Sequence, residues 1–435
     1  MKVLVLGSGG REHALVWKIA QSPLLTGLYC APGNPGIAQH ARCIPLTRGN
    51  YNGLLEFALS EHIDLTVVGP EQPLAEGIVD LFQAHGLTIF GPEKRAAELE
   101  WSKVFAKGFL VRHSIPTASY RVFERDDAHT IEGYLEHSGF PAVLKVDGLA
   151  AGKGVLICNT MDEALEAAKD IFVKGVFGGL GARLIVEEYL EGEEASLFAI
   201  TDGKEYVTLV PAQDYKRVFD GDAGKNTGGM GSIASTPVVT PGILDMVRMR
   251  IIEPTLRGMS NEGRPYSGCL YVGVMITSDG PKVVEFNSRF GDPESQVVLP
   301  LFKGDILPLL HASARGEVAE WKRRPTGVVS TDAAACVVLA SGGYPNSYST
   351  GREIRGLDDL GDLEDTMVFH AGTKQTGNTI ATAGGRVLGV ASFPSGATLE
   401  QAVARAYVAA GRIGFEGMHF RRDIGRRALK RVSVR

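Results

Sequence analysis

The chain begins with an apolar run, Met1 to Gly7, that is followed at once by a glycine-rich loop and by a segment with helical periodicity. A short run that is apolar at nearly every position is typical of a strand buried on both faces of a parallel sheet. Strand-like and helix-like segments then alternate to about residue 100. This alternation predicts a doubly wound α/β domain, which we place at residues 1–102.

The pattern changes after a helix-like segment at Lys103 to His113, where short strand-like runs and helices mix in an α+β pattern. A polar, glycine-rich stretch from Gln213 to Ser232 shows little periodicity, and we expect a long loop there. Loops of this length inside compact domains are usually functional. A charged stretch with a proline at residues 322–327 suggests a boundary. We therefore expect a second domain at residues 103–325 and a small α+β domain at residues 326–435.

Composition excludes several classes of protein. The 45 Lys and Arg residues against 50 Asp and Glu give a net charge of −5, which argues against a nucleic-acid partner. We therefore interpret the basic C-terminal tail as a solvated helix face. No run of 18 apolar residues suggests a membrane span, and five scattered cysteines without a CxxC pair disfavour a disulfide scaffold or a zinc ribbon. We expect a cytoplasmic protein.

The first chemical motif is the loop Gly7-Ser8-Gly9-Gly10-Arg11-Glu12-His13, between the first strand and the first helix. Glycines at such a turn let backbone N–H groups and the helix N-terminus approach an anion. A nicotinamide-dinucleotide fingerprint needs glycine where Glu12 stands, so hydride transfer is disfavoured. A tight turn without a ligand is the alternative.

A second glycine-rich segment runs from Lys145 to Gly154 and carries a second lysine, Lys153. A Walker A motif would need Ser or Thr at position 154 and a helix after it. The segment instead fits a flexible flap between antiparallel strands that closes over triphosphate oxygens, with a plain turn as the alternative. The acidic run from Glu187 to Glu194 could line an adenine pocket, although in isolation it favours a solvated turn.

A fourth motif follows a strand-like run near residue 284. Glu285 and Asn287 are two positions apart and therefore share one face of the strand. Their oxygens suit Mg²⁺, which binds protein through one or two oxygen ligands. Arg289 continues the same face and could grip a phosphate in a bidentate manner. The alternative is a hairpin strand that ends in a polar turn.

These motifs occur in the order and spacing of the ATP-grasp superfamily, whose members bind MgATP between two α+β lobes. Within it the chain resembles the phosphoribosylamine–glycine ligase family from Lys2 to about Ala428. The most specific match is the sequence RFGDPE at residues 289–294. Further similar segments are VLVLGSGGREHAL near the N-terminus, SKVFAKGFL, LKVDGLAAGKGV and, at residues 213–217, QDYKR.

The resemblance implies roles for particular residues in nucleotide and metal binding. Glu285 and Asn287 would bind Mg²⁺ or Mn²⁺. The preceding strand, Leu270 to Met275, carries no acid, so we expect these two to be the protein ligands. The phosphates of ATP would be contacted by lysines and by glycines of the flap, namely Lys103, Lys145, Gly148, Gly152, Lys153 and Gly154. The adenine would be contacted by Glu187, Glu188 and Leu190. The ribose would be bound by Glu194.

The resemblance also implies roles in substrate binding and chemistry. Arg289 would stabilise the transferring phosphoryl group and Asp292 would bind the glycine ammonium group. Residues 120–192 would form a lid that closes over the site. The residues assigned to substrate binding, chiefly to the phosphoribosyl substrate, are Gly9, Gly10, Arg11, Glu12, Asp214 and Lys216.

The implied activity is ATP-dependent ligation of glycine to phosphoribosylamine in purine biosynthesis, through a glycyl phosphate. The implied partners are these small molecules, with no nucleic acid and no membrane, and the chain would act as a monomer or a weak homodimer. Two alternatives remain open from the sequence. One is another ATP-grasp ligase or a carboxylase, and the other is a non-catalytic nucleotide-binding regulator.

Overall fold

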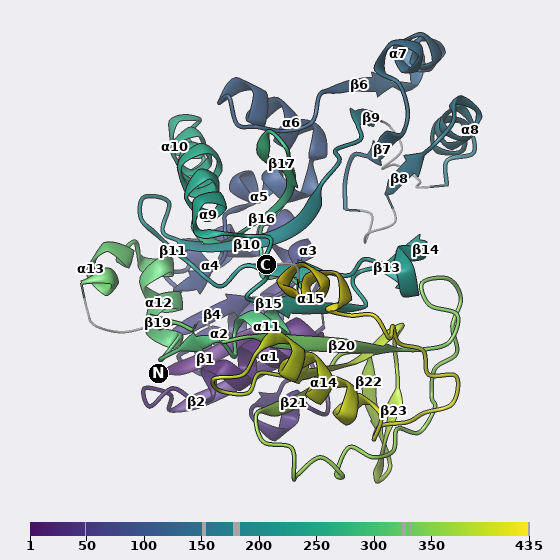
Figure 1. Cartoon of the computed structure of the whole chain (residues 1–435). Helices are drawn as coiled ribbons and strands as arrows, with labels where there is room; N and C mark the ends of the chain where they lie inside the picture. Colours follow the sequence, from purple (N-terminus) through teal and green to yellow (C-terminus); the bar gives the residue numbers. More distant parts are fainter. Residues whose placement is uncertain (48, 150–153, 177–182, 324–327, 331, 434–435) are drawn as a thin grey trace.

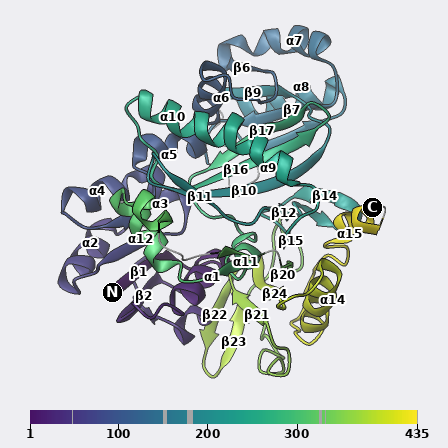
Figure 2. The ribbon, with the colours of Figure 1, turned by 60° about the vertical axis from the view of Figure 1, so that its left-hand side comes forward.

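The computed structural model describes residues 1–47, 49–149, 154–176, 183–323, 328–330 and 332–433 (Figure 1). Three sheets organise these residues: a five-stranded N-terminal sheet, a long nine-stranded sheet, and a four-stranded sheet that stands away from the body. The third sheet lies at the top of both ribbon views, and the C-terminal strands lie at the bottom (Figure 1, Figure 2). No helix among the described residues is long and apolar enough to cross a membrane.

The N-terminal sheet is parallel throughout, in the order β3-β2-β1-β4-β5. This order confirms the predicted doubly wound fold, in which ligands bind at the carboxyl ends of the strands. Its strands are β1 (Lys2–Gly7), β2 (Gly27–Pro32), β3 (Arg42–Cys43), β4 (Leu65–Val68) and β5 (Ile89–Phe90), and its helices are α1 (Gly10–Ile19), α2 (Tyr51–Ser60), α3 (Glu71–Glu76), α4 (Ile78–Ala84) and α5 (Lys94–Trp101).

The N-terminal run forms β1, the central strand of this sheet. Val3 and Val5 face one side of the sheet and pack with Leu15 of α1, whereas Leu4 and Leu6 face the helices of the other side. Both sets are fully or almost fully buried. Burial of each such side chain stabilises the fold by about 1.5–3 kcal/mol, so the sequence of β1 allows only a central strand.

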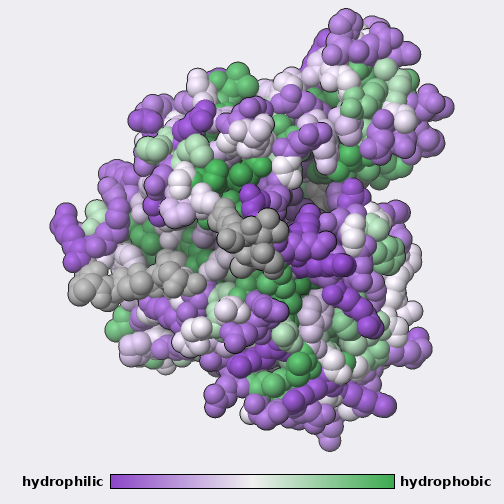
Figure 3. Space-filling model, viewed as in Figure 1, coloured by the Kyte–Doolittle hydropathy of each residue, from purple (hydrophilic) through white to green (hydrophobic). Residues whose placement is uncertain are grey.

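Helix α6 (Lys103–Arg112) leads from the N-terminal domain into the separate four-stranded sheet. We call that sheet, with its two helices, the lid; it is antiparallel in the order β6-β9-β7-β8. In the space-filling view it forms a lobe apart from the body (Figure 3). The lid elements are β6 (Tyr120–Glu124), α7 (Ile131–Ser138), β7 (Ala142–Val146), β8 (Val155–Cys158), α8 (Met161–Phe172) and β9 (Arg183–Glu188).

The nine-stranded sheet carries the hairpin of β16 (Gly268–Thr277) and β17 (Gly280–Asn287), whose pairing is irregular between Gly273 and Val274. Its first seven strands run in the order β17-β16-β10-β12-β15-β20-β24, followed by β21, with β11 paired to β10. The strands from the middle of the chain are β10 (Glu193–Thr201), β11 (Tyr206–Thr208), β12 (Ala212–Asp214) and β15 (Gly231–Ala234).

The expectation of a long loop from Gln213 to Ser232 is wrong. Within this stretch, β12 and β15 pair with each other in the sheet, and β13 (Arg217–Phe219) pairs with β14 (Ala223–Asn226). Small residues such as Ala212 and Gly231 form buried strands here without the β-branched alternation that would reveal them.

The C-terminal strands join the same sheet, because β15 pairs with β20. The sheet therefore crosses the boundary predicted near residue 326, and the domain limits stay predictions. Helix α14 (Leu399–Ala410) covers this end of the sheet through Ala402 and Ala406. The remaining C-terminal elements are β20 (Ala334–Ala340), β21 (Thr366–His370), β22 (Thr373–Thr376), β23 (Thr379–Thr382), β24 (Arg386–Ser392) and α15 (Arg426–Ser433).

The helices between β15 and β20 cover the central part of the molecule. They begin with α9 (Pro241–Val247), a π-helical turn (Arg248–Ile252) and α10 (Glu253–Asn261). The buried face of this helical segment packs on β16 and β17. The remaining elements are α11 (Ser295–Val298), β18 (Phe302–Lys303), α12 (Leu307–Arg315), α13 (Val318–Lys322) and β19 (Val328–Val329).

Candidate active site

The glycine loop after β1 is built around the carboxylate of Glu12. Its Oε2 accepts a hydrogen bond from the backbone N–H of Gly9 at 2.6 Å, and its Oε1 accepts from Arg11 Nε at 2.5 Å. A Cβ on Gly7 or on Gly69 would lie 2.5 or 2.3 Å from atoms of the Glu12 side chain. Glu12 therefore belongs to the architecture of the loop, and its assignment to substrate binding stays a prediction.

Arg11 extends this loop into a buried network of charges. Its Nη1 lies 3.8 Å from Glu71 of α3, and the same carboxylate is 3.3 Å from Arg289 Nε. Arg289 Nη2 lies 3.2 Å from Glu100 of α5, whose other oxygen accepts hydrogen bonds from Ser288. The two guanidinium groups hold the pKa of Glu71 at about 2, against the opposing effect of burial.

The position of Arg289 differs from the expectation that it continues the face of Glu285. Strand β17 ends at Asn287, and the carboxylates that pair with Arg289 come from the N-terminal domain. Its assignment to the transferring phosphoryl group stays a prediction. Sequence reasoning missed Glu71 and Glu100, since an ion pair between segments so far apart in the chain has no local pattern.

Asp292 lies beside the glycine loop. Its Oδ1 accepts from Gln296 Nε2 at 2.8 Å and its Oδ2 from Arg386 Nη2 at 3.1 Å, and a Cβ on Gly10 would lie 3.6 Å from Oδ1. Burial raises the pKa of this carboxyl, but the charges of Arg386 and Arg11 lower it by more, so that the net shift is downward. Asp292 is thus an anion beside the glycine loop, as binding of an ammonium group requires. Arg386, from β24, is a further residue that sequence reasoning missed.

Two lysines from different elements converge on Glu187 of β9. Lys107 Nζ of α6 lies 2.9 Å from Glu187 Oε2, and Lys145 Nζ of β7 lies 3.0 Å from the same oxygen. All three side chains are almost completely buried. Lys145 also donates to the carbonyl oxygen of Val284 at 3.1 Å, which connects the lid to β17.

Lys107 was not among the predicted residues, although it follows Lys103 by one helical turn. Residues four apart lie on the same helix face, and that spacing was the available signal. Lys103 Nζ donates instead to the carbonyl oxygen of Gly148 at 2.7 Å. Burial lowers the pKa of Lys107 to about 8, with Glu187 opposing the shift, and burial also lowers the pKa of Lys103.

Glu285 and Asn287 flank the buried Phe286 and therefore share the opposite face of β17. Lys216 lies 3.3 Å from Glu285 and forms a second ion pair with Glu194 of β10. Lys216 lowers the pKa of Glu285 to about 2 against the effect of burial, so this carboxylate is anionic at any ordinary pH. The structure thus brings together the predicted metal ligands Glu285 and Asn287, the lysine predicted to bind substrate and the predicted ribose ligand Glu194.

An anionic carboxylate next to an amide oxygen fits a hard divalent cation that keeps several waters. Within the described part of the chain, no group of three or more His, Cys, Asp or Glu side chains could hold a metal ion. A site of only two protein ligands is consistent with the donor set of Glu285 and Asn287.

Asp214 ends β12, two residues before Lys216. Its Oδ1 is buried and, among the described residues, has no hydrogen-bond partner. Burial raises the pKa of Asp214 well above its ordinary value, and the charge of Glu294 adds to the shift. Glu294 itself accepts a hydrogen bond from Ser196 Oγ at 3.0 Å. The site therefore contains a carboxyl whose pKa is raised near another, Glu285, whose pKa is lowered.

The predicted flap is described only at its ends. Gly152 and Lys153 lie outside the described residues. Gly148 adopts a left-handed backbone with φ of 115°, and the Gly154 carbonyl oxygen accepts from the Val146 N–H at 2.9 Å. These two ends continue the strands β7 and β8, as a flap between antiparallel strands requires.

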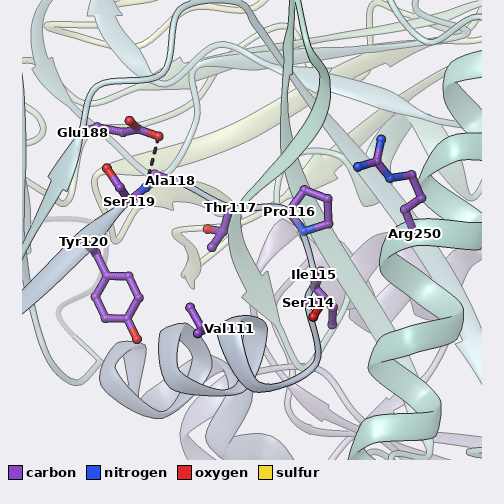
Figure 4. A pocket seen from close by; sticks show the side chains of 10 residues that line it. All are labelled: Val111, Ser114, Ile115, Pro116, Thr117, Ala118, Ser119, Tyr120, Glu188 and Arg250. Atoms are coloured by element: carbon purple, nitrogen blue, oxygen red, sulfur yellow. Dashed lines mark hydrogen bonds between the residues drawn. The ribbon is translucent and has the colours of Figure 1, made fainter.

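Glu188 is bound to the segment that enters the lid. Its backbone N–H donates to the carbonyl oxygen of Ser119 at 3.0 Å, and its Oε1 accepts from the Ser119 N–H at 3.0 Å (Figure 4). Leu190 follows β9 and is half-buried. The backbone contacts expected from Glu188 and Leu190 to adenine stay predictions, and the Glu188 N–H is already used in this structure.

Comparison with known proteins agrees with this arrangement. The chain matches family models described as the N domain, the ATP-grasp (A) domain and the C domain of phosphoribosylglycinamide synthetase, over residues 1–100, 101–295 and 334–427. A phosphoribosylamine–glycine ligase of Brucella melitensis is 48% identical over 438 residues, which cover 100% of both chains.

Solved structures share the fold. A phosphoribosylamine–glycine ligase from Thermotoga maritima superposes with a TM-score of 0.82 at 33% identity, over 97% of this chain and 100% of the other. The biotin carboxylase domain of a Hydrogenobacter thermophilus 2-oxoglutarate carboxylase gives 0.72 at 18% identity, over 96% and 91%, and shows the fold alone. Family models, relatives of full length and the ATP-grasp geometry agree: the chain belongs to the phosphoribosylamine–glycine ligase family.

Proposed function

We propose that the protein joins glycine to 5-phosphoribosylamine with ATP, giving glycinamide ribonucleotide, ADP and phosphate in de novo purine biosynthesis. The observation that carries the proposal is the convergence of Lys107, Lys145 and Glu187 in the ATP-grasp core of a chain that belongs to this family over its full length. We further propose that it works in the cytoplasm, as a monomer or a weak homodimer.

The chemistry explains why a cationic site is needed. A glycine carboxylate is a poor electrophile, so its oxygen first attacks the γ-phosphorus of ATP to give glycyl phosphate and ADP. This transfer spreads negative charge over phosphoryl oxygens, and fixed cations stabilise that charge best in a site that excludes water. Lys107 and Lys145 supply such charges from the core and from the lid respectively.

Glu187 is suited to recognise the adenine. Its Oε2 holds the two lysines, while its Oε1 is buried and has no hydrogen-bond partner among the described residues. A buried oxygen without a donor is costly, and the exocyclic amino group of adenine would satisfy it. Glu194, on the next strand, would bind the ribose hydroxyls.

Glu285 and Asn287 would hold Mg²⁺ or Mn²⁺. When bound, the cation neutralises charge on the nucleotide phosphates. Lys216 lies 3.3 Å from Glu285 and keeps that carboxylate anionic, which prepares it for a cation.

The second half-reaction places phosphoribosylamine at the glycine loop after β1. Arg11 and the backbone N–H groups of Gly10 and its neighbours at the start of α1 would bind the phosphate. The neutral amine attacks the acyl carbon of glycyl phosphate and phosphate leaves. Asp292, beside the same loop, would bind the glycine ammonium group, so the two reacting molecules meet between the N-terminal domain and β17.

The test is release of ADP from MgATP with phosphoribosylamine generated in situ, with and without glycine. Turnover that requires both substrates supports the proposal. Turnover with bicarbonate in place of glycine would instead indicate a carboxylase. Binding of MgATP without release of ADP under any of these conditions would indicate a non-catalytic nucleotide-binding protein.

A further inference from the structure

Thr117 lies in the segment that joins helix α6 to the first lid strand, and we call residues 114–119 the hinge. A cavity of about 670 Å³ lies beside this segment and is lined mainly by it (Figure 4). Thr117 is half-buried and carries a hydroxyl group, to which neither the family motifs nor the assigned site residues give a role.

The Thr117 hydroxyl has two partners. It donates to the carbonyl oxygen of Val283 at 2.7 Å and accepts from Lys107 Nζ at 2.8 Å. Since a hydroxyl has one proton and the carbonyl receives it, the oxygen faces Lys107 purely as an acceptor. The hinge is therefore attached both to β17, two residues before Glu285, and to a lysine of the nucleotide site.

The hydrogen bond to Thr117 determines which direction is left for Lys107 to donate to a ligand. A lysine ammonium has three N–H donors. One is directed to Thr117, and the ammonium group also forms an ion pair with Glu187 Oε2 at 2.9 Å and lies 5.7 Å from the centroid of the Tyr120 ring. The contacts with Thr117 and Glu187 together fix the orientation of the ammonium group, whereas Lys107 held by Glu187 alone could rotate about that single contact.

We propose that Thr117 is a positioning residue for ATP binding: its hydroxyl orients the Lys107 ammonium so that one N–H points at the nucleotide phosphates. The inference rests on the proposed function only in that the nucleotide is ATP. Thr117 also pairs with Val283 of β17 shortly before the chain enters the lid. The same hydroxyl therefore connects Lys107 to the hinge.

The backbone holds the hinge independently of the hydroxyl group. The Val283 N–H donates to the carbonyl oxygen of Pro116 at 2.7 Å, and Thr117 and Val283 form a parallel bridge. A Thr117→Val variant keeps this bridge and the side-chain shape, so we expect it to fold. It removes only the acceptor of Lys107 and the donor to Val283.

The experiment measures MgATP binding by titration calorimetry, and separately kcat and KM, for the full chain and four variants: Thr117→Val, Thr117→Ser, Lys107→Met and Lys107→Met combined with Thr117→Val. We expect Thr117→Val to raise the Kd and KM for ATP about tenfold, the size expected for one hydrogen bond to a charged group, with kcat changed less than about twofold. Thr117→Ser keeps the hydroxyl and should stay within about twofold of the wild type. In a Lys107→Met background, adding Thr117→Val should change ATP affinity by less than about twofold, because the two residues act as one unit.

Three results would overturn the inference: wild-type affinity in Thr117→Val, equal damage in Thr117→Ser, or full additivity with Lys107→Met. Failure of the proposed function is distinguishable, since it would appear as wild-type protein that binds MgATP but does not consume glycine.

Discussion

The ion pair between Lys107 and Glu187, at 2.9 Å, joins the core helix α6 to the lid strand β9. Both side chains are buried, and Lys145 approaches the same oxygen from β7. A carboxylate between two lysines offsets the repulsion between their charges. The lid and the core thus meet at the residues that we propose bind the nucleotide.

The first prediction concerns Lys107. Replacement by Met should raise the Kd for ATP at least about tenfold, because one charge-assisted hydrogen bond to a phosphate is lost. Lys103→Met, at a lysine on the preceding turn that is itself predicted to contact the phosphates of ATP, is the comparison. Since Lys103 donates to Gly148, we expect a smaller change there. Titration calorimetry measures both, and a larger effect at Lys103 would contradict this assignment.

The same lysine predicts how ATP affinity depends on pH. Burial lowers the pKa of Lys107 to about 8 in the free protein, and the nucleotide phosphates favour its charged form, so binding raises that pKa. Affinity should be constant between about pH 7 and 7.5 and should fall as the pH rises through about 8, because binding then requires uptake of a proton. The Kd measured from pH 7 to 9.5 tests this, and Lys107→Met should flatten the profile.

Much of the fold follows from local sequence pattern. Two apolar runs separated by Ser278-Asp279-Gly280 are typical of a hairpin, which β16 and β17 form, and the alternation of the first hundred residues predicts the doubly wound sheet. Strands β12 to β15 were not expected, because small and polar residues form them. Their pairing depends on neighbours in the sheet, such as β20, that come a hundred residues later in the chain.

The candidate site divides in the same way. Glu285 and Asn287 share a face because of the period of a strand, which the sequence alone reveals. Arg386 reaches Asp292 from β24, and no local pattern connects positions 94 residues apart. Lys107 is intermediate: its spacing from Lys103 was visible, but only its burial against Glu187 distinguishes it from a surface lysine.

Glu285 is the subject of a second mutational prediction. Glu285→Gln should reduce metal-dependent release of ADP by more than about a hundredfold. Loss of a residue that only hydrogen-bonds to a metal ligand already lowers metal affinity or activity about 10–100-fold, and Glu285 is expected to bind the metal itself. Lys216 retains its pair with Glu194, so we expect the variant to fold. Glu205→Gln is the control, at a half-exposed surface pair with Lys322. Activity of the Glu285 variant equal to that of the control, with unchanged Mg²⁺ dependence, would refute the assignment.

Arg11 allows the two substrates to be separated. Arg11→Ala should raise the KM for phosphoribosylamine about tenfold or more, because a charge-assisted contact to its phosphate is lost, and leave the KM for ATP near its original value. Its guanidinium also pairs with Glu12 at 2.5 Å, so a lower melting temperature should accompany the change. Steady-state kinetics well below that temperature make the comparison. A change confined to ATP would mean that the substrates are assigned to the wrong domains.

The last prediction concerns two arginines near the C-terminus that lie over the ring of Tyr215. In the sequence Tyr215 stands between Asp214 and Lys216. Arg421 and Arg427 place their Cζ atoms 5.1 and 5.3 Å from the ring centroid, and both pair with Asp222. They differ in burial, since the Arg421 side chain is 1% exposed and that of Arg427 is 54% exposed.

That difference in burial should separate the two variants in stability. Arg421→Ala leaves the carboxylates of Asp222 and Asp423 without their buried partner and should lower the free energy of unfolding by about 3–5 kcal/mol. Arg427→Ala removes a largely solvated pair and should cost less than about 1 kcal/mol. Urea unfolding followed by circular dichroism measures both values. Equal losses of unfolding free energy in the two variants would contradict this expectation. They would show that the ring contacts shared by both arginines, rather than the buried ion pairs of Arg421, hold Tyr215 and the neighbouring Lys216.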